Sequence, residues 1–161
     1  MNWFFPQASV HIDEAGVGDA DILSEIHEQS FSRGWGPDEF ATLVAQRNVI
    51  CLAARRIGVL GARRTVGFIL VRHASDEAEI LSVAVTPASR GKGIGRRLVE
   101  EAMRRLYRER INTLFLEVDE ENDAAVSLYR ALGFAEVGRR TGYYSQAGSA
   151  ATALVMRLQL R

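Results

Sequence analysis

The sequence is poor in cysteine and proline and carries no net charge. Its one cysteine, Cys51, excludes a disulfide within the chain and fits a reducing compartment, so cytoplasmic residence is expected. The 20 basic and 20 acidic side chains cancel, which argues against a protein that binds nucleic acid through its overall charge. No apolar run reaches the length of a membrane span, and the apolar residues 1–6 lack the basic segment and cleavage site of a signal peptide. We therefore expect neither a membrane nor a nucleic acid as partner.

Metal-ligating and nucleophilic side chains are also scarce. The three histidines, His11, His27 and His73, have no cysteine or carboxylate at ligand spacing, so neither a metal nor a catalytic role is assigned to them. Cys51 lies in the apolar run 49–54, which is typical of an inert buried thiol rather than a nucleophile. The chemistry of this chain must therefore come from other groups.

What the chain does have is material for a core. Of its 161 residues, 47% are hydrophobic and 25% are charged, which predicts a single globular domain over residues 1–161. The clearest helix begins at Ile94, from which Leu98, Ala102 and Leu106 continue a four-residue repeat beside a charged face. This helix joins two strands as a βαβ unit, which predicts a parallel pair, whereas three earlier strands joined by turns are expected to be antiparallel. The expected strands are 9–13, 49–55, 66–72, 78–85, 113–118, 134–137 and 153–160, and the other helices begin near Asp19 or Asp21, at Pro37 and at Asn122.

Residues 90–95, Arg-Gly-Lys-Gly-Ile-Gly, are the most informative stretch. Three alternating glycines let the backbone N–H groups approach a ligand, and the helix that follows adds its free N–H groups and positive dipole end. Together these features predict a site for phosphate or pyrophosphate. A P-loop would need Ser or Thr after Gly-Lys, and a dinucleotide fingerprint would need glycine where Arg96 stands. An ordinary glycine-rich turn is the alternative that these residues leave open.

Two motifs carry a family resemblance. The Arg-x-x-Gly-x-Gly arrangement resembles the pyrophosphate loop of the GCN5-related N-acetyltransferase (GNAT) superfamily, and residues 122–134 resemble its second signature, Asn-x-x-Ala…Leu-Tyr-x-x-x-Gly-Phe. The resemblance implies an α/β (α+β) fold with a central mixed, mostly antiparallel sheet, a splayed parallel pair and four flanking helices. It also implies acetyl-coenzyme A (acetyl-CoA) as co-substrate.

The same resemblance assigns the acetyl-CoA contacts. It implies that the backbone of Val83, Ala84 and Val85 binds the pantetheine amides and the thioester oxygen, and that the Asn122 side chain touches the pantetheine arm while capping its helix. The diphosphate would lie against the glycine loop, with three basic side chains adding charge. The loop residues are Arg90, Gly91, Lys92, Gly93, Ile94, Gly95 and Arg96.

Within the superfamily, the chain resembles the RimI-type group, which acetylates the amino terminus of a ribosomal protein. The resemblance lies in Leu116-Glu117-Val118, in the aromatic residues near the front and in the arginine and tyrosine pairs near the end. Gly142, Ser145 and the arginine-rich stretch 55–64 depart from that group on the acceptor side or in a hairpin. Two alternatives therefore stay open: an acetyltransferase for a small amine, and a non-catalytic CoA-binding domain.

Glu117 and Tyr129 are the candidate catalytic residues. The apolar neighbours of Glu117 predict a buried carboxyl group suited to base chemistry, although Thr113, Phe115 and Glu117 share a strand face that could instead meet solvent. The resemblance places the general base at Glu117 and the general acid, which protonates the leaving thiolate, at Tyr129. The alternative for Tyr129 is an ordinary core tyrosine.

Aromatic and acidic residues suggest an acceptor site. Phe31, Trp35, Tyr143 and Tyr144 are candidates for lining it, although aromatic residues serve equally well in a core. The acidic run 119–121 reads as a solvated loop, or alternatively as a feature that attracts a basic peptide.

Overall fold

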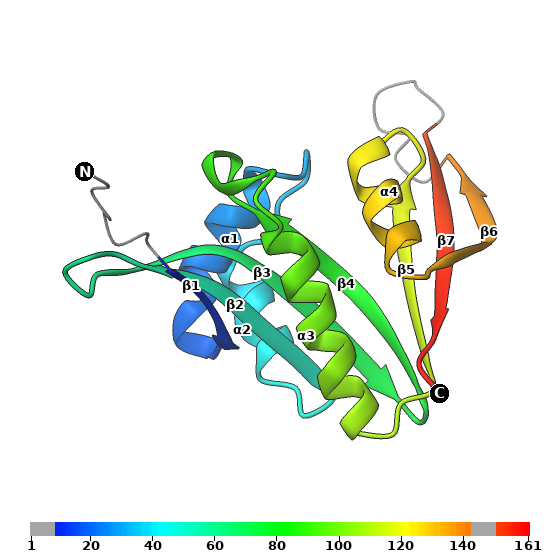
Figure 1. The fold of residues 1–161 in the computed structure, drawn as a ribbon, viewed down its shortest axis with the longest axis horizontal. Helices are drawn as coiled ribbons and strands as arrows, with labels where there is room; N and C mark the ends of the chain where they lie inside the picture. Colours follow the sequence, from blue (N-terminus) through cyan, green and yellow to red (C-terminus); the bar gives the residue numbers. More distant parts are fainter. Residues whose placement is uncertain (1–8, 143–150) are drawn as a thin grey trace, which may run out of the picture. The chain divides into compact units, whose positions relative to one another are not determined.

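The computed structural model describes residues 9–142 and 151–161, and its trace is shown in Figure 1. The described strands form a mixed seven-stranded sheet in the order β1-β2-β3-β4-β5-β7-β6, with β4 and β5 parallel, and the described part has four α-helices. This confirms the predicted fold class and element order. The elements are β1 (Ser9–Glu14), α1 (Ala20–Glu28), α2 (Pro37–Val44), β2 (Val49–Ile57), β3 (Arg63–Ala74), β4 (Glu77–Val85), α3 (Ile94–Arg108), β5 (Thr113–Asp119), α4 (Asp123–Ala131), β6 (Ala135–Thr141) and β7 (Thr152–Gln159), with short 3-10 helices η1 (Val17–Asp19) and η2 (Pro87–Ser89).

The chain divides into two compact units. Unit 1 comprises Met1–Val71 and Ser82–Ala102, and unit 2 comprises Arg72–Leu81 and Met103–Arg161. The single-domain interpretation of residues 1–161 stays a prediction.

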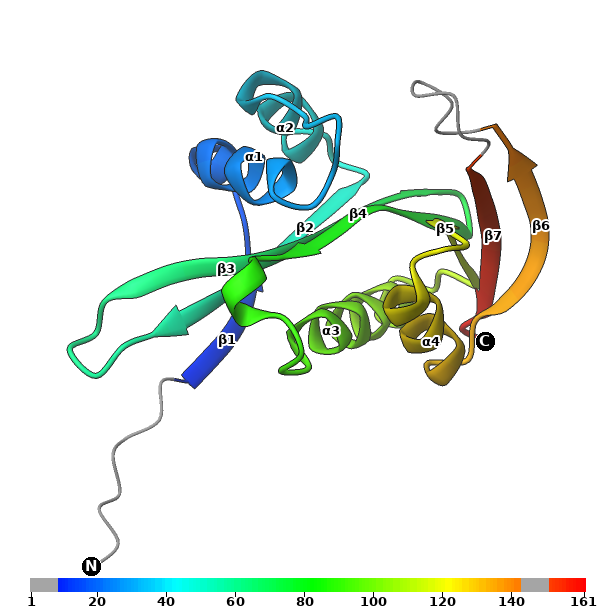
Figure 2. The ribbon, with the colours of Figure 1, turned by 90° about the horizontal axis from the view of Figure 1, so that it is seen from above.

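Unit 1 buries its central strand on both faces. Helices α1 and α2 lie on one face of β2 and β3, and the first part of α3, residues 94–102, lies on the other (Figure 2). Because both faces are covered, β3 is buried continuously from Val66 to Val71 instead of alternating. Phe40 of α2 and Phe68 of β3 meet edge to face at 5.4 Å in this core.

Gly67 of β3 is required by close packing in unit 1. A Cβ at this position would lie 2.9 Å from the Ala84 carbonyl oxygen and 3.4 Å from Leu98 Cδ1. Only glycine lets β3 come so close to the end of β4 and to α3.

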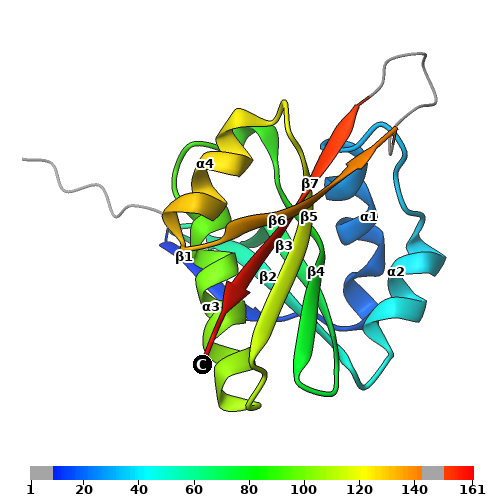
Figure 3. The same cartoon turned by 90° about the vertical axis from the view of Figure 1, so that its right-hand side faces the viewer.

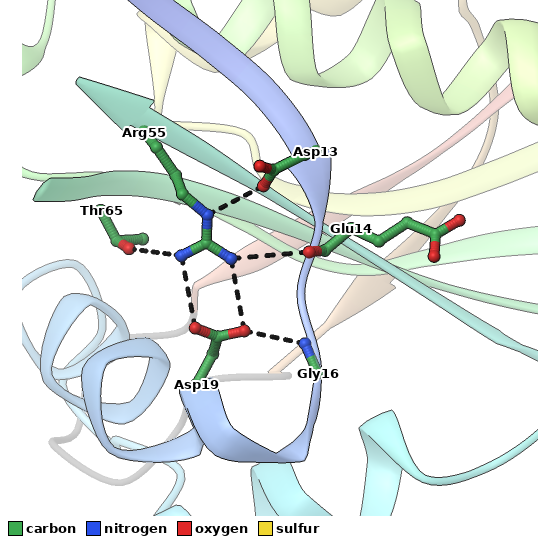
Figure 4. Close-up of polar contacts among 6 residues, drawn as sticks. All are labelled: Asp13, Glu14, Gly16, Asp19, Arg55 and Thr65. Atoms are coloured by element: carbon green, nitrogen blue, oxygen red, sulfur yellow. Dashed lines mark hydrogen bonds and ion pairs between the residues drawn. The ribbon is translucent and has the colours of Figure 1, made fainter. Parts of the chain in front are cut away.

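Arg55 ties together three segments of unit 1 (Figure 4). Its Nε donates to Asp13 at 2.8 Å, and its two terminal nitrogens each donate to the Asp19 carboxylate at 3.3 Å. The remaining donors reach Thr65 Oγ1 at 2.9 Å and the Glu14 carbonyl at 3.5 Å. Every guanidinium N–H therefore has an acceptor.

In unit 2, β7 runs between β5 and β6 (Figure 3). The β5 strand alternates, with Leu114, Leu116 and Val118 buried and the intervening residues half-buried, so one face of this strand is much more covered than the other. The parallel pairing of β4 with β5 comprises 77–79 with 113–115. A bulge interrupts β6 between Glu136 and Gly138.

The described residues include no helix that is long and apolar enough to cross a membrane.

Candidate functional site

The predicted glycine loop stands at the N-terminus of α3. Gly91 and Gly93 have φ angles of 75° and 79°, in the left-handed region that favours glycine, and no atom lies within 4 Å of where either Cβ would be. The Gly93 carbonyl accepts the first helical hydrogen bond, from Arg97 N–H at 3.1 Å. This turn leaves open space beside the free N–H groups of a helix, an arrangement that fits a diphosphate.

The three basic residues of the loop have different surroundings. Arg90 donates to the Val85 carbonyl at 3.0 Å and to Ser30 Oγ at 3.0 Å, so its side chain fastens the loop to β4 and to the end of α1. Arg96 pairs with Glu100 at 3.2 Å. Lys92 is exposed and meets no polar partner within the described residues. Lys92 is thus the basic group most available to a phosphate.

The end of β4 leads into this loop. Ala84 is buried and Val83 and Val85 are half-buried, while Thr86 N–H donates to the Val66 carbonyl at 2.8 Å. Ser82 Oγ, just before them, is a buried hydroxyl with no partner among the described residues. Unit 1 therefore contains both the strand end and the glycine loop to which the resemblance assigns acetyl-CoA contacts.

Asn122 caps α4 as the sequence predicts. Its Oδ1 accepts a hydrogen bond from Ala125 N–H at 3.2 Å, and its carbonyl accepts from Val126 N–H at 3.0 Å. The helix ends before Gly133, whose φ of 102° confirms the predicted glycine after the helix. The contact of Asn122 with pantetheine stays a prediction.

Glu117 is not the fully buried carboxyl group that its neighbours in sequence suggest. Its side chain is 21% exposed, and its Oε1 accepts a hydrogen bond from Arg140 Nη1 at 2.7 Å. The apolar Leu116 and Val118 point to the opposite, buried face of β5, because side chains alternate along a strand. Glu117 is therefore a hydrogen-bonded group with access to solvent.

Arg140 was the partner that the sequence did not reveal. It lies on β6, opposite Ala153 of β7, and β7 in turn pairs with β5. Only this strand order brings a residue 23 positions away in the sequence against Glu117. In the sequence, only the family resemblance singles out the arginine pair 139–140.

Tyr129 lies on the buried face of α4. Only 6% of it is exposed, and its ring meets Phe134 edge to face at 5.6 Å. Burial raises the pKa of its hydroxyl to about 12, so the group keeps its proton at neutral pH. A protonated hydroxyl is the state that a general acid requires.

The two described aromatic candidates for the acceptor site lie together in unit 1. Phe31 and Trp35 stack on the His27 ring at centroid distances of 4.4 and 4.6 Å. Phe31 is exposed, whereas Trp35 is half-buried. Tyr143 and Tyr144 lie outside the described residues. The sequence pattern assigns His27 neither a metal nor a catalytic role, although His27 continues the buried face that Leu23 and Ile26 form on α1.

The acidic run 119–121 is partly neutralised within unit 2. Glu120 pairs with Arg139 at 3.1 Å, and Asp119 Oδ1 accepts from Glu121 N–H at 2.9 Å. These contacts favour a local structural role over a free negative patch.

Cys51 is buried in β2, as predicted. Burial raises the pKa of its thiol to about 12, and the Asp19 charge adds to this, so the reactive thiolate is disfavoured. Within 9–142 and 151–161, no three His, Cys, Asp or Glu side chains are grouped to hold a metal ion.

Comparison with known proteins agrees with this geometry. The protein-family model described as "Acetyltransferase (GNAT) family" matches residues 20–134 of this chain. The N-alpha-acetyltransferase RimI of Mycobacterium tuberculosis is 37% identical over 133 residues, which cover 81% of this chain and 82% of that protein. The crystal structure of the ribosomal-protein-S18-alanine N-acetyltransferase from Escherichia coli is similar at a TM-score of 0.85, with 26% identity and 94% of each chain covered. Arabidopsis thaliana NAA60 in complex with acetyl-CoA shares the fold at a TM-score of 0.81, with 19% identity over 94% of this chain and 98% of that chain.

Proposed function

This chain belongs to the acetyltransferase (GNAT) family and is an N-acetyltransferase, and we propose that it transfers the acetyl group of acetyl-CoA to the α-amino group of a protein N-terminus. An alanine-initiated ribosomal protein is the leading acceptor. Two of the relatives named above support this choice of acceptor, one named an N-alpha-acetyltransferase and the other a ribosomal-protein-S18-alanine N-acetyltransferase.

The observation that carries the catalytic part is the setting of Glu117. A terminal amine has a pKa of about 7.7–8.0 and is mostly charged at neutral pH, so a modest base is enough to make it nucleophilic. Glu117 is partly accessible to solvent, and its Oε1 accepts a hydrogen bond from Arg140 Nη1 at 2.7 Å. A carboxyl group that is oriented and accessible in this way suits the removal of a proton from an arriving amine.

The proposed transfer is direct. Glu117 takes one proton from the ammonium group, and the free amine forms the new C–N bond at the thioester carbonyl. The C–S bond then breaks, and Tyr129 gives its proton to the departing thiolate. The raised pKa of Tyr129, about 12, keeps that proton available. The nitrogen loses a second proton as it becomes an amide, and this proton passes through water to Tyr129. Water removes the first proton from Glu117, so that one proton is released per turnover.

The chain's own residues would hold acetyl-CoA in two ways. The turn at Gly91 and Gly93 exposes backbone N–H groups to the diphosphate, and Lys92 adds a free positive charge. The backbone of 83–85 and the Asn122 side chain would bind the pantetheine arm. Acetyl-CoA, when bound, supplies the activated acetyl group.

The test is mass spectrometry of products from acetyl-CoA and a mixed acceptor panel. The panel holds peptides that begin with alanine, the same peptides with a blocked α-amine but a free lysine, and small amines such as polyamines. We expect acetylation of free α-amino groups only. Acetylation of small amines alone would replace the proposal with a small-molecule acetyltransferase, and cofactor binding without any product would favour the non-catalytic alternative.

A further inference from the structure

The loop between α1 and α2, residues 29–36, is fastened by side chains of α1. Trp35 N–H donates to His27 Nδ1 at 3.1 Å, and Ser24 Oγ donates to the Trp35 carbonyl at 2.6 Å. Both backbone polar groups of Trp35 are therefore satisfied by one helix. His27 and Ser24 are themselves buried, at 3% and 6% exposure.

His27 also organises the aromatic residues around it. Phe31 and Trp35 stack on the ring from the loop, Phe40 of α2 meets its edge at 5.6 Å, and Phe68 of β3 lies at 6.4 Å. One imidazole thus touches every aromatic candidate that the described part of unit 1 offers for the acceptor. Removing it would leave Phe31 and Trp35 without the ring on which they stack, and Trp35 without one of the two hydrogen bonds that its backbone makes with side chains of α1.

The contact with Trp35 fixes the protonation state of His27. Nδ1 can accept a hydrogen bond only while it has no proton, so the proton of the neutral ring is on Nε2. Protonation would set an N–H of the ring against the Trp35 N–H and place a charge among aromatic rings. The neutral ring is therefore the one compatible with the ordered loop.

We propose that His27 is a positioning residue for the acceptor: its neutral imidazole holds Phe31 and Trp35 in the arrangement that receives the acceptor, and its protonation releases the 29–36 loop. This inference rests on the proposed function only for the identity of the acceptor. The pH-dependent fastening of the 29–36 loop by His27 is inferred from the contacts within unit 1.

Burial lowers the pKa of His27, and the Glu39 carboxylate on α2 acts against this by raising it. The loop, α2 and β3 otherwise present Phe31, Trp35, Phe40 and Phe68 to the ring, which carry no charge. With the folded pKa below the ordinary value of 6.5, the ordered loop is fully present above that pH and is lost as pH falls through the folded pKa.

The test reads the loop directly through Trp35 fluorescence. The chain has two tryptophans, so Trp3→Phe leaves Trp35 as the sole emitter. We expect the emission to follow a single-proton titration below pH 6.5, because release of the loop ends the stacking of Trp35 on His27 at 4.6 Å and exposes the indole to water. Glu39→Gln removes the opposing charge and should move the midpoint to lower pH.

His27→Asn is the decisive variant. The Asn oxygen keeps an acceptor where Nδ1 was but does not titrate, so the pH response of Trp35 should vanish. His27→Phe keeps a ring but no acceptor and should give a displaced emission at every pH. Ser24→Ala is the matched control, since it removes the other bond to Trp35 without removing the titration. An unchanged titration in His27→Asn, or its absence in Trp3→Phe alone, would overturn the proposal.

The acceptor part is tested by the KM for an α-amino peptide between pH 5.5 and 8. The peptide amine titrates in the same way with every variant. The ratio of the KM of the parent to the KM of His27→Asn therefore reports the contribution of His27 alone. We expect this ratio to rise by about tenfold per pH unit below the midpoint, with the affinity for acetyl-CoA unchanged. A flat ratio beside a clear Trp35 titration would refute the acceptor role. No product from any acceptor would refute the proposed function and leave the fluorescence to decide on the loop.

Discussion

Arg55 in unit 1 and Arg140 in unit 2 both donate to a carboxylate, at 2.8 Å to Asp13 and at 2.7 Å to Glu117. Their surroundings differ. The Arg55 side chain is 15% exposed and all its donors have acceptors, whereas the Arg140 side chain is 56% exposed. Arg55 meets two carboxylates, a hydroxyl and a carbonyl from segments that it holds together (Figure 4). The arrangement around Arg55 has no capacity for a ligand.

The difference separates a closed ion-pair network from a largely exposed pair. A partly buried network in which every donor has an acceptor stabilises the fold, because removing one member leaves the other polar groups without partners. An ion pair that is largely exposed to solvent contributes little to stability, yet it leaves a carboxylate that is oriented and accessible to a ligand. Short N–O distances alone would not have distinguished the two.

Glu117→Gln should have the largest effect on activity and almost none on folding. We expect turnover to fall by about 10²–10⁴-fold, because the amide cannot take a proton, while acetyl-CoA affinity stays close to that of the parent. Steady-state kinetics and calorimetric titration with acetyl-CoA measure the two quantities. Turnover within a factor of about two of the parent would remove Glu117 as the base.

Arg55→Leu should have the largest effect on stability. It leaves Thr65 without its donor and Asp19 with only the hydrogen bond from Gly16 N–H, and because Asp13 is 48% exposed, water compensates in part. We expect a loss of about 2–3 kcal/mol in the free energy of unfolding, measured with urea. The matched control is Arg63→Leu on the exposed hairpin, which should stay within about 0.5 kcal/mol. Equal losses in the two variants would contradict a closed network at Arg55.

Asp19 should make part of the stability depend on acid. Burial raises its pKa, but hydrogen bonds from Gly16 N–H and Arg55, together with the Arg55 charge, outweigh this and hold the pKa below 3.8. The contribution is present above that pH and is lost as pH falls through the folded value. We expect Asp19→Asn to be less stable at pH 6 and to have a shallower acid dependence of the urea midpoint. Parallel curves for variant and parent would show that Asp19 is not the responsible group.

Arg140→Gln should have the smallest effect of the four. We expect stability within about 1 kcal/mol of the parent, since the pair is largely exposed, and a turnover lowered about two- to fivefold as Glu117 loses its orienting partner. The sharper measurement is the double variant with Glu117→Gln, in which the effect of Arg140→Gln on turnover should disappear. An equal effect in both backgrounds would mean that Arg140 acts elsewhere.

Local signals in the sequence predicted much of this structure. Pro37 at a first turn, the Asn122 cap and Gly133 after a helix each act over a few residues, and all three lie where expected. The first residues of β3 were missed because Arg63 and Arg64 are polar, and the hairpin ladder continues beyond the buried core. The hydrophobic pattern of the sequence shows which part of a strand is buried, but it does not show how far the backbone pairing of that strand extends.

The candidate site was harder to predict because its partners come from distant parts of the chain. Glu117 lies on β5, within the strand predicted over 113–118, but its surroundings depend on Arg140 through the order β5-β7-β6. In the sequence His27 is an isolated histidine, since nothing there shows that the backbone N–H of Trp35 donates a hydrogen bond to its ring. The glycine loop was predictable because both its turn and its helix are local.

The bulge in β6 bears on whether a strand of another chain could extend this sheet. β6 is the last strand of the sheet, so one of its edges offers unpaired backbone groups to any passing strand. The extra residue Val137 breaks the regular spacing of those groups, and the charged Glu136 and Arg139 flank it. A foreign strand would find no regular register along this edge. The bulge that interrupts pairing is thus also a feature that disfavours edge-to-edge aggregation.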